Sequence, residues 1–266
     1  MNPTDKSIVS VLAQQIRSAY ASGKPIAPLR EQVGADPAAA YAVQEANTAH
    51  WLAEGRRLVG RKIGLTSAAV QKQLGVDQPD YGMLYADMAV PDGFEISRSR
   101  LIQPRVEAEV AFVLARDLDN ERLTAADVIR AIDFVVPALE IVDSRIADWN
   151  IRITDTVADN ASSGLYVIGN EPRALTGLDL RNCKMKMECG GEVVSSGAGH
   201  ACLGHPVNAL LWLGQVMSKV GRPLRAGDTV LSGALGPMVA VRWGTAFEAQ
   251  IDGLGTVRAV FGPATT

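Results

Sequence analysis

Two glutamates stand two positions apart in an apolar run, and this spacing is the strongest chemical signal in the sequence. Residues 106–114 read VEAEVAFVL, with glutamates at 107 and 109. Because successive side chains of a strand point to opposite faces, Glu107 and Glu109 share one face of the predicted strand. Two negative charges about 4 Å apart repel by about 4 kcal/mol at an effective dielectric near 20. Solvent, a basic partner, proton uptake or a cation must therefore offset the repulsion.

A third carboxylate stands within another apolar run. Residues 134–143 read FVVPALEIVD and contain Glu140. Charged side chains are rarely buried unless they are paired or bound to a metal. Three carboxylates without a cluster of histidines or cysteines suit a hard cation, Mg²⁺ or Mn²⁺, better than zinc. The alternative is that Glu107 and Glu109 line a solvated face of a sheet and that Glu140 pairs with an arginine.

Lys62 and Asp80 are candidates for proton transfer. Lys62 lies in GRKIGLTS (60–67), among glycines and aliphatic residues. Partial loss of water there would lower the pKa of the lysine and suit it to acid/base chemistry. The alternative is a lysine at a strand end whose ammonium group reaches solvent. Asp80, in QPDYG (78–82), has the surroundings of a turn residue.

Other polar motifs carry weaker signals. The polar string DNASSG (159–164) is either an ordinary loop or a loop that faces a substrate. Residues 197–204 have the spacing GxGxxxxG, which differs from the GxGxxG of dinucleotide-binding loops. Ser232 lies outside a GxSxG motif, so an α/β-hydrolase triad is not expected. His200 and His205 flank the same glycines, and His205-Pro206 is typical of a helix start.

The composition is that of a soluble globular protein large enough to bury a substantial core. The chain has 266 residues, 47% hydrophobic and 21% charged, with a net charge of −3. The acidic balance and scattered basic residues argue against a nucleic-acid partner. No apolar stretch approaches the roughly 20 residues that span a membrane, and the polar start MNPTDK lacks a signal-peptide core. We therefore expect a cytoplasmic protein whose three cysteines are reduced thiols.

Helical periodicity marks the first part of the chain. Apolar residues at helical spacing predict a helix over 7–21. Asp36-Pro37 is typical of an N-cap and a first helical residue, and the helix that follows is expected to end at Gly55. We expect residues 1–55 to form a helical N-terminal region and residues 56–266 to form a β-rich catalytic domain.

Short β-rich runs fill the rest of the chain. Strands are predicted over 57–65, 106–115, 134–143, 164–168, 183–188, 192–195, 228–232, 238–242, 246–251 and 255–261. Cys189-Gly190-Gly191 indicates a hairpin turn, and helices are expected after Thr124 and from Pro206. Strands and helices do not alternate regularly. We therefore predict an α+β fold, a mixed, mostly antiparallel β-roll or barrel with a helical N-terminal region.

Seven strings, in order along nearly the whole chain, resemble the hydratase and decarboxylase branch of the fumarylacetoacetate hydrolase superfamily. The strings are GRKIGLTS (60–67), QLGVDQPDYG (73–82), QPRVEAEVAFVL (103–114), PALEIVDSRIADW (137–149), DTVADNASSG (155–164), GHPVNALLWL (204–213) and SGALGPMVAV (232–241). Within this branch the chain is most similar to the hydratases of 2-hydroxypenta-2,4-dienoate in aromatic degradation. The family's mixed β-roll or barrel agrees with the predicted fold.

The resemblance implies three kinds of site residue. Ligands to Mg²⁺ or Mn²⁺ are expected from Glu107, Glu109 and Glu140. The catalytic acid/base groups are expected to be Lys62 and Asp80. Substrate-binding residues are expected in one loop, namely Asn160, Ser162 and Ser163.

The implied reaction is metal-dependent addition of water to 2-hydroxypenta-2,4-dienoate, which gives 4-hydroxy-2-oxopentanoate. Hydrolases of the superfamily use a His–Glu pair, and no matching histidine stands in this chain, so hydrolysis is the weaker branch. The close alternative is decarboxylation of 2-oxo-3-hexenedioate (4-oxalocrotonate), although RKIGLTS and SGALGPMVAV favour the hydratases. A non-catalytic partner subunit of such an enzyme pair is a third possibility. The resemblance also implies a homo-oligomer, a small 2-oxo acid substrate and association with a pathway enzyme.

Overall fold

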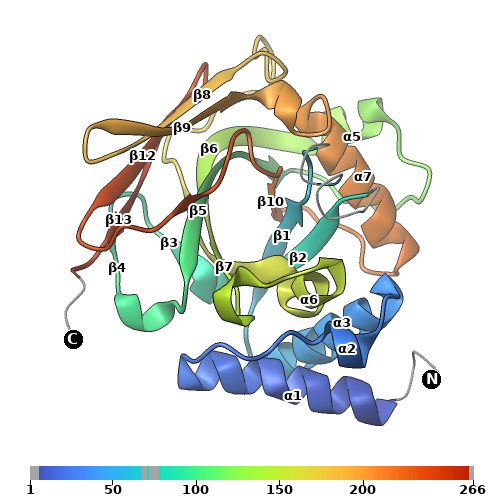
Figure 1. The fold of residues 1–266 in the computed structure, drawn as a ribbon. Helices are drawn as coiled ribbons and strands as arrows, with labels where there is room; N and C mark the ends of the chain where they lie inside the picture. Colours follow the sequence, from blue (N-terminus) through green and yellow to red (C-terminus); the bar gives the residue numbers. More distant parts are fainter. Residues whose placement is uncertain (1–5, 68–70, 72–77, 264–266) are drawn as a thin grey trace.

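Two β-sheets with helices around them make up the part of the chain that the computed structural model describes, residues 6–67, 71 and 78–263 (Figure 1). In these residues the larger sheet has eight strands: β1 (Leu58–Gly64), β2 (Asp80–Tyr85), β3 (Ala89–Val90), β5 (Pro104–Leu114), β6 (Ile132–Asp143), β7 (Ser163–Ile168), β10 (Thr229–Leu231) and β11 (Val239–Ala240). The smaller sheet has five: β4 (Glu95–Ile96), β8 (Lys184–Cys189), β9 (Glu192–Ala198), β12 (Ala246–Ile251) and β13 (Gly255–Phe261). Residues 73–77 of the family-like string at 73–82 lie outside the described residues.

The long strands β5 and β6 form the centre of the larger sheet. Its order is β2-β1-β10-β5-β6-β7-β3, and β11 pairs with β5. Three pairs are parallel, β1 with β10, β3 with β7 and β4 with β13. The other pairs of the described strands are antiparallel. The predicted mixed, mostly antiparallel α+β fold is therefore confirmed.

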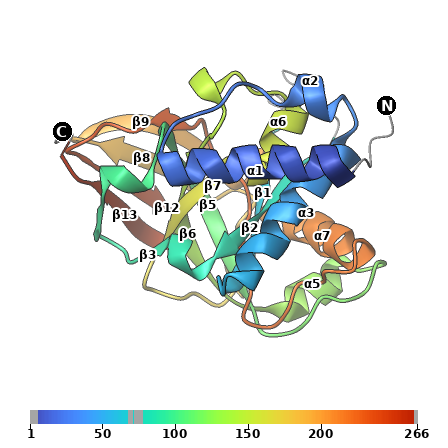
Figure 2. The same cartoon turned by 90° about the horizontal axis from the view of Figure 1, so that it is seen from below.

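Six α-helices surround the sheets within the described residues. They are α1 (Lys6–Ser22), α2 (Arg30–Val33), α3 (Pro37–Ala53), α5 (Ala125–Ala131), α6 (Ile153–Ala158) and α7 (Pro206–Lys219). Single 3₁₀ turns are η1 (Ala86–Met88), η2 (Arg98–Arg100), η3 (Ala147–Trp149), η4 (Asn160–Ser162) and η5 (Gly199–Ala201). Helix α1 crosses the underside of the molecule and packs against α3 (Figure 2). None of the described helices is long and apolar enough to cross a membrane.

The predicted helix starts are confirmed in their capping contacts. The Asp36 side chain accepts a hydrogen bond from the Ala38 N–H at 2.9 Å, at the start of α3. Thr124 and Asp127 form a reciprocal capping box at the start of α5. His205 Nδ1 accepts from the Val207 N–H at 3.0 Å, at the start of α7. These starts depend on residues a few positions apart, which is why the sequence predicts them.

Strand β2 was not predicted, whereas the hairpin between β8 and β9 was. All six residues of β2 are buried, so the strand lacks the alternation of apolar and polar residues that marks a half-exposed strand. Gly190 and Gly191 connect β8 to β9 with φ values of 61° and 82°. Positive φ at both positions is the requirement of a tight two-residue hairpin, and glycine meets it without strain.

Two apolar clusters hold these elements together. The larger cluster fills the space between the two sheets, where β12 and β13 pack against β6. The smaller cluster joins α1 and α3 to Ile146 and Val157, which follow β6. The three cysteines are buried and form no disulfide, as predicted. The division of the chain at residue 55 stays a prediction.

Candidate metal and acid/base site

Three glutamates converge on one face of the paired strands β5 and β6. The antiparallel register places Glu107 directly opposite Glu140, and Glu109 shares the face of Glu107. One carboxylate oxygen from each glutamate lies within 4.8 Å of those of the other two. Glu109 and Glu140 are 0% and 1% exposed, and Glu107 is partly exposed. The alternative of a solvated sheet face, which concerned Glu107 and Glu109, is therefore wrong for Glu109.

The buried carboxylate oxygens have few donors. Glu109 Oε2 accepts a hydrogen bond from the Gly233 N–H at 2.7 Å. Lys62 Nζ lies 3.1 Å from Glu140 Oε1, so Glu140 pairs with a lysine and not with an arginine. Glu109 Oε1 and Glu140 Oε2 have no hydrogen-bond partner. A buried polar atom without a partner destabilises a fold by about 1–3 kcal/mol, and a cation at these oxygens would remove that penalty. The donor set, carboxylate oxygens alone, fits a hard divalent cation.

Burial and mutual repulsion raise the pKa values of the cluster. Burial, followed by the charge of Glu140, raises the pKa of Glu107 to about 7. Burial also raises the pKa values of Glu109 and Glu140, and the Lys62 ammonium opposes both shifts. A divalent cation favours the charged form of each carboxylate and acts against these shifts. A proton and a divalent cation would therefore compete for these three carboxylates.

Lys62 lies on β1, and its ammonium group contacts the cluster at Glu140. It is paired with Leu231 of β10 and with Gly82 of β2. Burial lowers the pKa of Lys62, but Glu140 and then Asp80 raise it, and the net pKa lies above the ordinary value. The expected lowering is therefore wrong in direction. The sequence indicates burial of the lysine but not the carboxylates that gather around its ammonium group.

Asp80 is the first residue of β2 and lies beside Lys62. It is 2% exposed and belongs to a strand, so the turn suggested by its neighbours in sequence is wrong. A Cβ atom on the opposite residue, Gly64, would lie 2.2 Å from Asp80 Oδ1 and 3.5 Å from Lys62 Nζ. The absence of a side chain at Gly64 therefore gives both groups their space. Burial raises the pKa of Asp80, and Lys62 opposes the shift.

The polar loop after α6 is hydrogen-bonded to β2. Asn160 Oδ1 accepts from the Met83 N–H at 2.7 Å, and Asn160 Nδ2 donates to the Met83 carbonyl at 3.0 Å. Ser163 Oγ donates to the Asn160 carbonyl at 2.8 Å. A Cβ atom on Gly82 would lie 2.3 Å from that carbonyl and 2.7 Å from Ser163 Oγ. Since Gly82 and Asp80 share a face of β2, the loop lies on the face of the sheet that carries Lys62 and Asp80.

Ser162 contacts the same loop from within. Its Oγ lies 3.4 Å from Asp159 Oδ2 and 3.4 Å from Thr156 Oγ1. The side chains of Asn160, Ser162 and Ser163 thus make hydrogen bonds inside the protein. Their predicted contact with the substrate stays a prediction.

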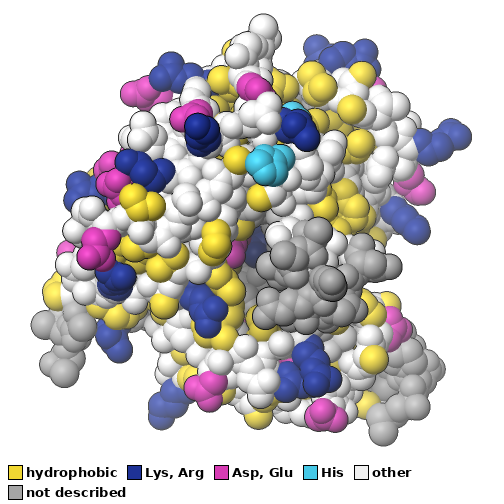
Figure 3. Space-filling view, turned by 45° about the horizontal axis from the view of Figure 1, so that its top comes forward, with side chains coloured by type: hydrophobic (Ala, Val, Ile, Leu, Met, Phe, Trp, Pro, Cys, Tyr) yellow, Lys and Arg dark blue, Asp and Glu magenta, His cyan; other side chains and the backbone are white. Residues whose placement is uncertain are grey.

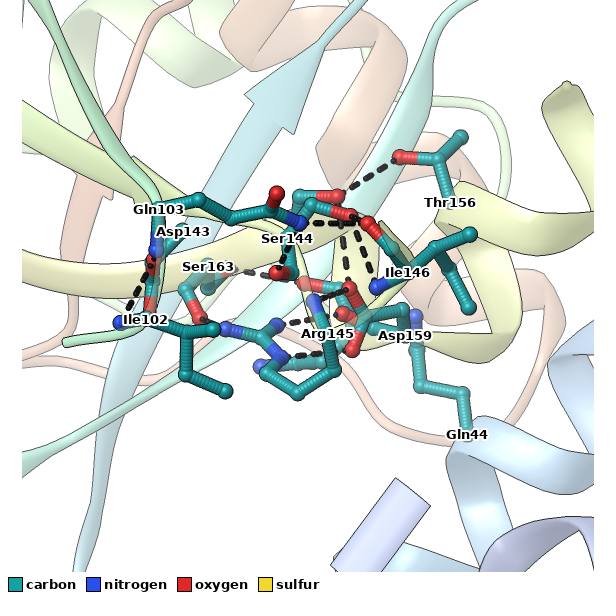
Figure 4. A network of polar contacts seen from close by, with 12 residues as sticks. Gln44, Ile102, Gln103, Asp143, Ser144, Arg145, Ile146, Thr156, Asp159 and Ser163 are labelled. Atoms are coloured by element: carbon teal, nitrogen blue, oxygen red, sulfur yellow. Dashed lines mark hydrogen bonds and ion pairs between the residues drawn. The ribbon is translucent and has the colours of Figure 1, made fainter. Parts of the chain in front are cut away.

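Sequence reasoning missed a buried ion pair, Arg145 with Asp159, close to this loop (Figure 4). The Arg145 Nε–Asp159 Oδ1 distance is 2.6 Å, and the two side chains are 1% and 0% exposed. Asp159 is the only charged residue of TVADNASSG, whereas Arg145 stands between Asp143 and Asp148 in IVDSRIADW. The apolar surroundings indicate that these charges are paired, but the sequence does not single out Asp159 among the aspartates near Arg145.

Ser232 and His205 take no part in the cluster. Ser232 Oγ accepts from the Val110 N–H at 3.2 Å and donates to the Gly233 carbonyl at 3.1 Å, so it joins β10 to β5. His205 caps α7. The sequence-based rejection of a serine hydrolase agrees with these structural roles.

Charged side chains of both signs are interspersed on the face shown in Figure 3. Acidic and basic side-chain atoms also lie at the bottom of a hollow near the centre of that face. The described side chains on this face form no broad basic patch of the kind that binds nucleic acid.

Three comparisons relate the chain to known proteins. The sequence profile of the fumarylacetoacetate (FAA) hydrolase C-terminal family matches residues 45–261. The chain is 62% identical over 250 residues to 2-keto-4-pentenoate hydratase 1 of Dechloromonas aromatica (strain RCB), which covers 94% of this chain and 95% of that protein. It is also 62% identical to the TodF product hydratase of Pseudomonas putida F1, over 95% of this chain and 94% of that one. The solved structure of 4-oxalocrotonate decarboxylase from Pseudomonas putida G7, complexed with magnesium and adipate, superimposes with a TM-score of 0.92 at 36% identity, covering 97% of this chain and 98% of that one.

Proposed function

The chain belongs to the fumarylacetoacetate hydrolase family, and from this premise we propose that it is a hydro-lyase that adds water to 2-hydroxypenta-2,4-dienoate. The prediction of a hydratase is confirmed by relatives that are 62% identical over nearly the full chain and are named hydratases. The observation that carries the proposed chemistry is the convergence of three glutamates beside Lys62 and Asp80. The expected product is 4-hydroxy-2-oxopentanoate.

We assign Glu107, Glu109 and Glu140 as the ligands of Mg²⁺ or Mn²⁺. The buried oxygens that lack donors support this assignment, and so does the magnesium in the related decarboxylase complex. When bound, the cation supplies Lewis-acid chemistry to the substrate's C2 oxygen.

Lys62 and Asp80 carry the proposed proton transfers. First a proton leaves the C2 hydroxyl and C5 gains a proton, which converts the dienol into an α,β-unsaturated 2-oxo acid. Water then adds at C4, and the Lys62 ammonium stabilises the negative charge that develops on the C2 oxygen. C3 gains the last proton. Asp80, buried beside Lys62, accepts and returns protons in these steps, and the two residues share the transfers.

The second candidate is decarboxylation of 2-oxo-3-hexenedioate. The solved decarboxylase superimposes closely, but its 36% identity lies well below the 62% of the hydratases. A non-catalytic subunit is the third candidate. A subunit without activity has no need for buried, mutually repelling carboxylates next to Lys62 and Asp80, and these therefore favour an enzyme.

A turnover assay with product identification tests the proposal. Chelator-treated protein is mixed with 2-hydroxypenta-2,4-dienoate, with and without Mg²⁺ or Mn²⁺, and the products are identified by NMR. Metal-dependent formation of 4-hydroxy-2-oxopentanoate supports the hydratase. Release of CO₂ from 2-oxo-3-hexenedioate, with no turnover of the dienoate, would move the protein to the decarboxylases. No turnover of either substrate would favour the non-catalytic subunit.

We also propose that the protein forms a homo-oligomer, that it associates with a pathway enzyme and that it is cytoplasmic. The family resemblance and the sequence support these three proposals. Light scattering of the purified protein tests the first, and co-purification with a decarboxylase of the same pathway tests the second. A monomer at micromolar concentration would contradict the proposed homo-oligomer.

A further inference from the structure

The buried guanidinium of Arg145 forms hydrogen bonds with both ends of the loop that lies on β2. Arg145 Nη2 donates to the Asp159 carbonyl at 2.8 Å, and Arg145 Nη1 donates to the Ser163 carbonyl at 2.9 Å. Arg145 Nε donates to Asp159 Oδ1 at 2.6 Å, and the Arg145 backbone N–H donates to Asp159 Oδ2 at 2.9 Å (Figure 4). Such a fork of directional donors is available to arginine and not to lysine.

The residues between these two anchors have an unfavourable backbone conformation. Asn160, Ala161 and Ser162 have φ values of 54°, 51° and 53°, which are left-handed values at three successive non-glycine positions. The left-handed helical conformation costs L-residues roughly 1–2 kcal/mol each. The turn therefore requires strong contacts on both sides, and the Arg145 bonds to the flanking carbonyls are of that kind.

The turn connects Arg145 to the strand that begins with Asp80. Asn160 makes two hydrogen bonds to Met83, three residues after Asp80 in β2. On its other side, Arg145 follows the end of β6, the strand that carries Glu140. Glu140 is thus connected to Asp80 along the backbone of β6 to Arg145, through hydrogen bonds to the turn and from the turn to Met83, and along the backbone of β2.

A neighbouring carboxylate extends this chain of contacts to β5. Asp143, the last residue of β6, accepts from the Ile102 N–H at 2.9 Å and from the Gln103 N–H at 2.7 Å. These residues directly precede β5, which carries Glu107 and Glu109. The end of β6 therefore fixes the start of β5 and, through Arg145, the turn on β2.

We infer that Arg145 is a positioning residue for the proposed reaction. It holds the left-handed turn at Asn160–Ser162 against β2 and so sets where Asp80 lies relative to the three glutamates. This inference rests on the proposed function. Arg145 is not expected to contact the substrate, because it is 1% exposed and its guanidinium is bonded to Asp159 and Ser163.

Arg145→Lys tests the inference, because it keeps the charge beside Asp159 and removes the fork. The matched control is Val257→Ala, which truncates a buried side chain in β13 of the other sheet and should lower the thermal stability. Three quantities are measured for each variant: kcat and KM for 2-hydroxypenta-2,4-dienoate, the Mg²⁺ dissociation constant by calorimetry, and hydrogen–deuterium exchange of peptides 80–85 and 158–165.

For Arg145→Lys we expect kcat to fall about 100-fold, as for a displacement of a catalytic group by about 1 Å. The Mg²⁺ dissociation constant should change less than threefold, since the ligands lie on β5 and β6. Exchange should rise in both peptides together. Val257→Ala should keep kcat within twofold of wild type at a comparable loss of thermal stability.

A kcat within threefold of wild type in folded Arg145→Lys would overturn the inference, and so would unchanged exchange at 80–85. If Arg145→Lys does not fold, Asp159→Asn replaces it, with the same expected fall in kcat and the same rise in exchange. A wild-type protein without hydratase activity would contradict the proposed function alone. The exchange of the two peptides would then decide whether Arg145 positions β2.

Discussion

Buried polar atoms without partners are concentrated at the glutamate cluster. Among the described residues, the buried oxygens Asp80 Oδ1, Glu109 Oε1 and Glu140 Oε2 have no hydrogen-bond partner. Folded proteins satisfy most buried polar atoms, so this concentration supports the proposed metal and acid/base site. At the scale of single residues, the cluster therefore gives the sharpest predictions.

Replacement of one ligand should abolish metal-dependent turnover. Glu140→Gln removes the charge of a proposed ligand that is also the partner of Lys62, so we expect kcat to fall at least about 1000-fold and Mg²⁺ binding to weaken beyond detection by calorimetry. The control is Glu248→Gln, an exposed glutamate on β12 that should behave as wild type. Wild-type Mg²⁺ affinity in Glu140→Gln would refute its role as a ligand.

Glu107 should make the stability of chelator-treated protein depend on pH. Its pKa is about 7 in the folded protein against an ordinary value of 4.5, so the folded state holds the proton more tightly. The stabilising contribution of Glu107 is therefore complete below pH 4.5 and is lost as the pH rises through 7. We expect the melting temperature of chelator-treated protein to fall between pH 5 and 7.5, measured by circular dichroism. Glu107→Gln should flatten this dependence, and an unchanged slope in that variant would contradict the assignment.

Part of the site was predictable from residue types alone. The pair Glu107 and Glu109 and the isolated Glu140 indicate a hard cation because of their apolar surroundings. The direction of the Lys62 pKa shift was not predictable, since it depends on carboxylates that other strands bring next to the ammonium. The Arg145–Asp159 pair was missed for the same reason, because fourteen positions separate its two members in the sequence.

At the scale of elements, close approach of the loop to β2 depends on a glycine. Gly82→Ala would place Cβ 2.3 Å from the Asn160 carbonyl, and a backbone atom cannot move aside as a flexible side chain does. We expect a loss of about 1–3 kcal/mol in the free energy of unfolding and a large fall in kcat, measured by denaturant titration and by turnover.

The control for this variant is Gly214→Ala in α7. The nearest atom to its added Cβ is Leu123 Cδ1 at 2.8 Å, the tip of a side chain that can rotate, and alanine favours a helix over glycine. We expect Gly214→Ala to change stability by less than about 1 kcal/mol. If the two substitutions lowered stability and kcat equally, the close approach of the Asn160 carbonyl to Gly82 would not be the cause of the effect.

Helix starts were predictable, whereas several strands were not. Asp36, Thr124 and His205 cap helices through contacts two or three residues away, and such local signals are visible in the sequence. Strand β2 is defined by its pairing with β1, and the two-residue strands β3 and β4 pair with β7 and β13. Pairing between distant segments leaves little trace in a single sequence, especially where both faces of a strand are buried.

At the scale of the whole molecule, the site joins distant parts of the chain. Residues 62, 80, 107, 109 and 140 lie on four strands of one curled sheet, and the smaller sheet and the N-terminal helices pack against it. Ligand binding to such a site stabilises the folded state as a whole. The metal should therefore affect global unfolding and not only the local environment of the glutamates.

Addition of Mg²⁺ should raise the melting temperature of the chelator-treated protein. At 100 times the dissociation constant, binding to the folded state alone contributes about 2.7 kcal/mol. For a chain of this size that corresponds to roughly 5–10 °C, measured by differential scanning calorimetry. Glu109→Gln should lose this increase, while Glu248→Gln should keep it. An equal increase in both variants would place the stabilising cation elsewhere.

The donor-poor carboxylates of β5 and β6 also have a consequence for directed evolution. Glu109 has an oxygen without a donor and destabilises the fold when no cation is bound, so an apolar replacement at 109 would be selected in a screen for heat resistance performed in chelating buffer. The same replacement at 140 would not, because it leaves the buried Lys62 ammonium without its partner. Such a screen would therefore eliminate part of the proposed metal site within a few rounds. The same screen with saturating Mg²⁺ would retain it, because the cation then makes each glutamate a contributor to thermal stability.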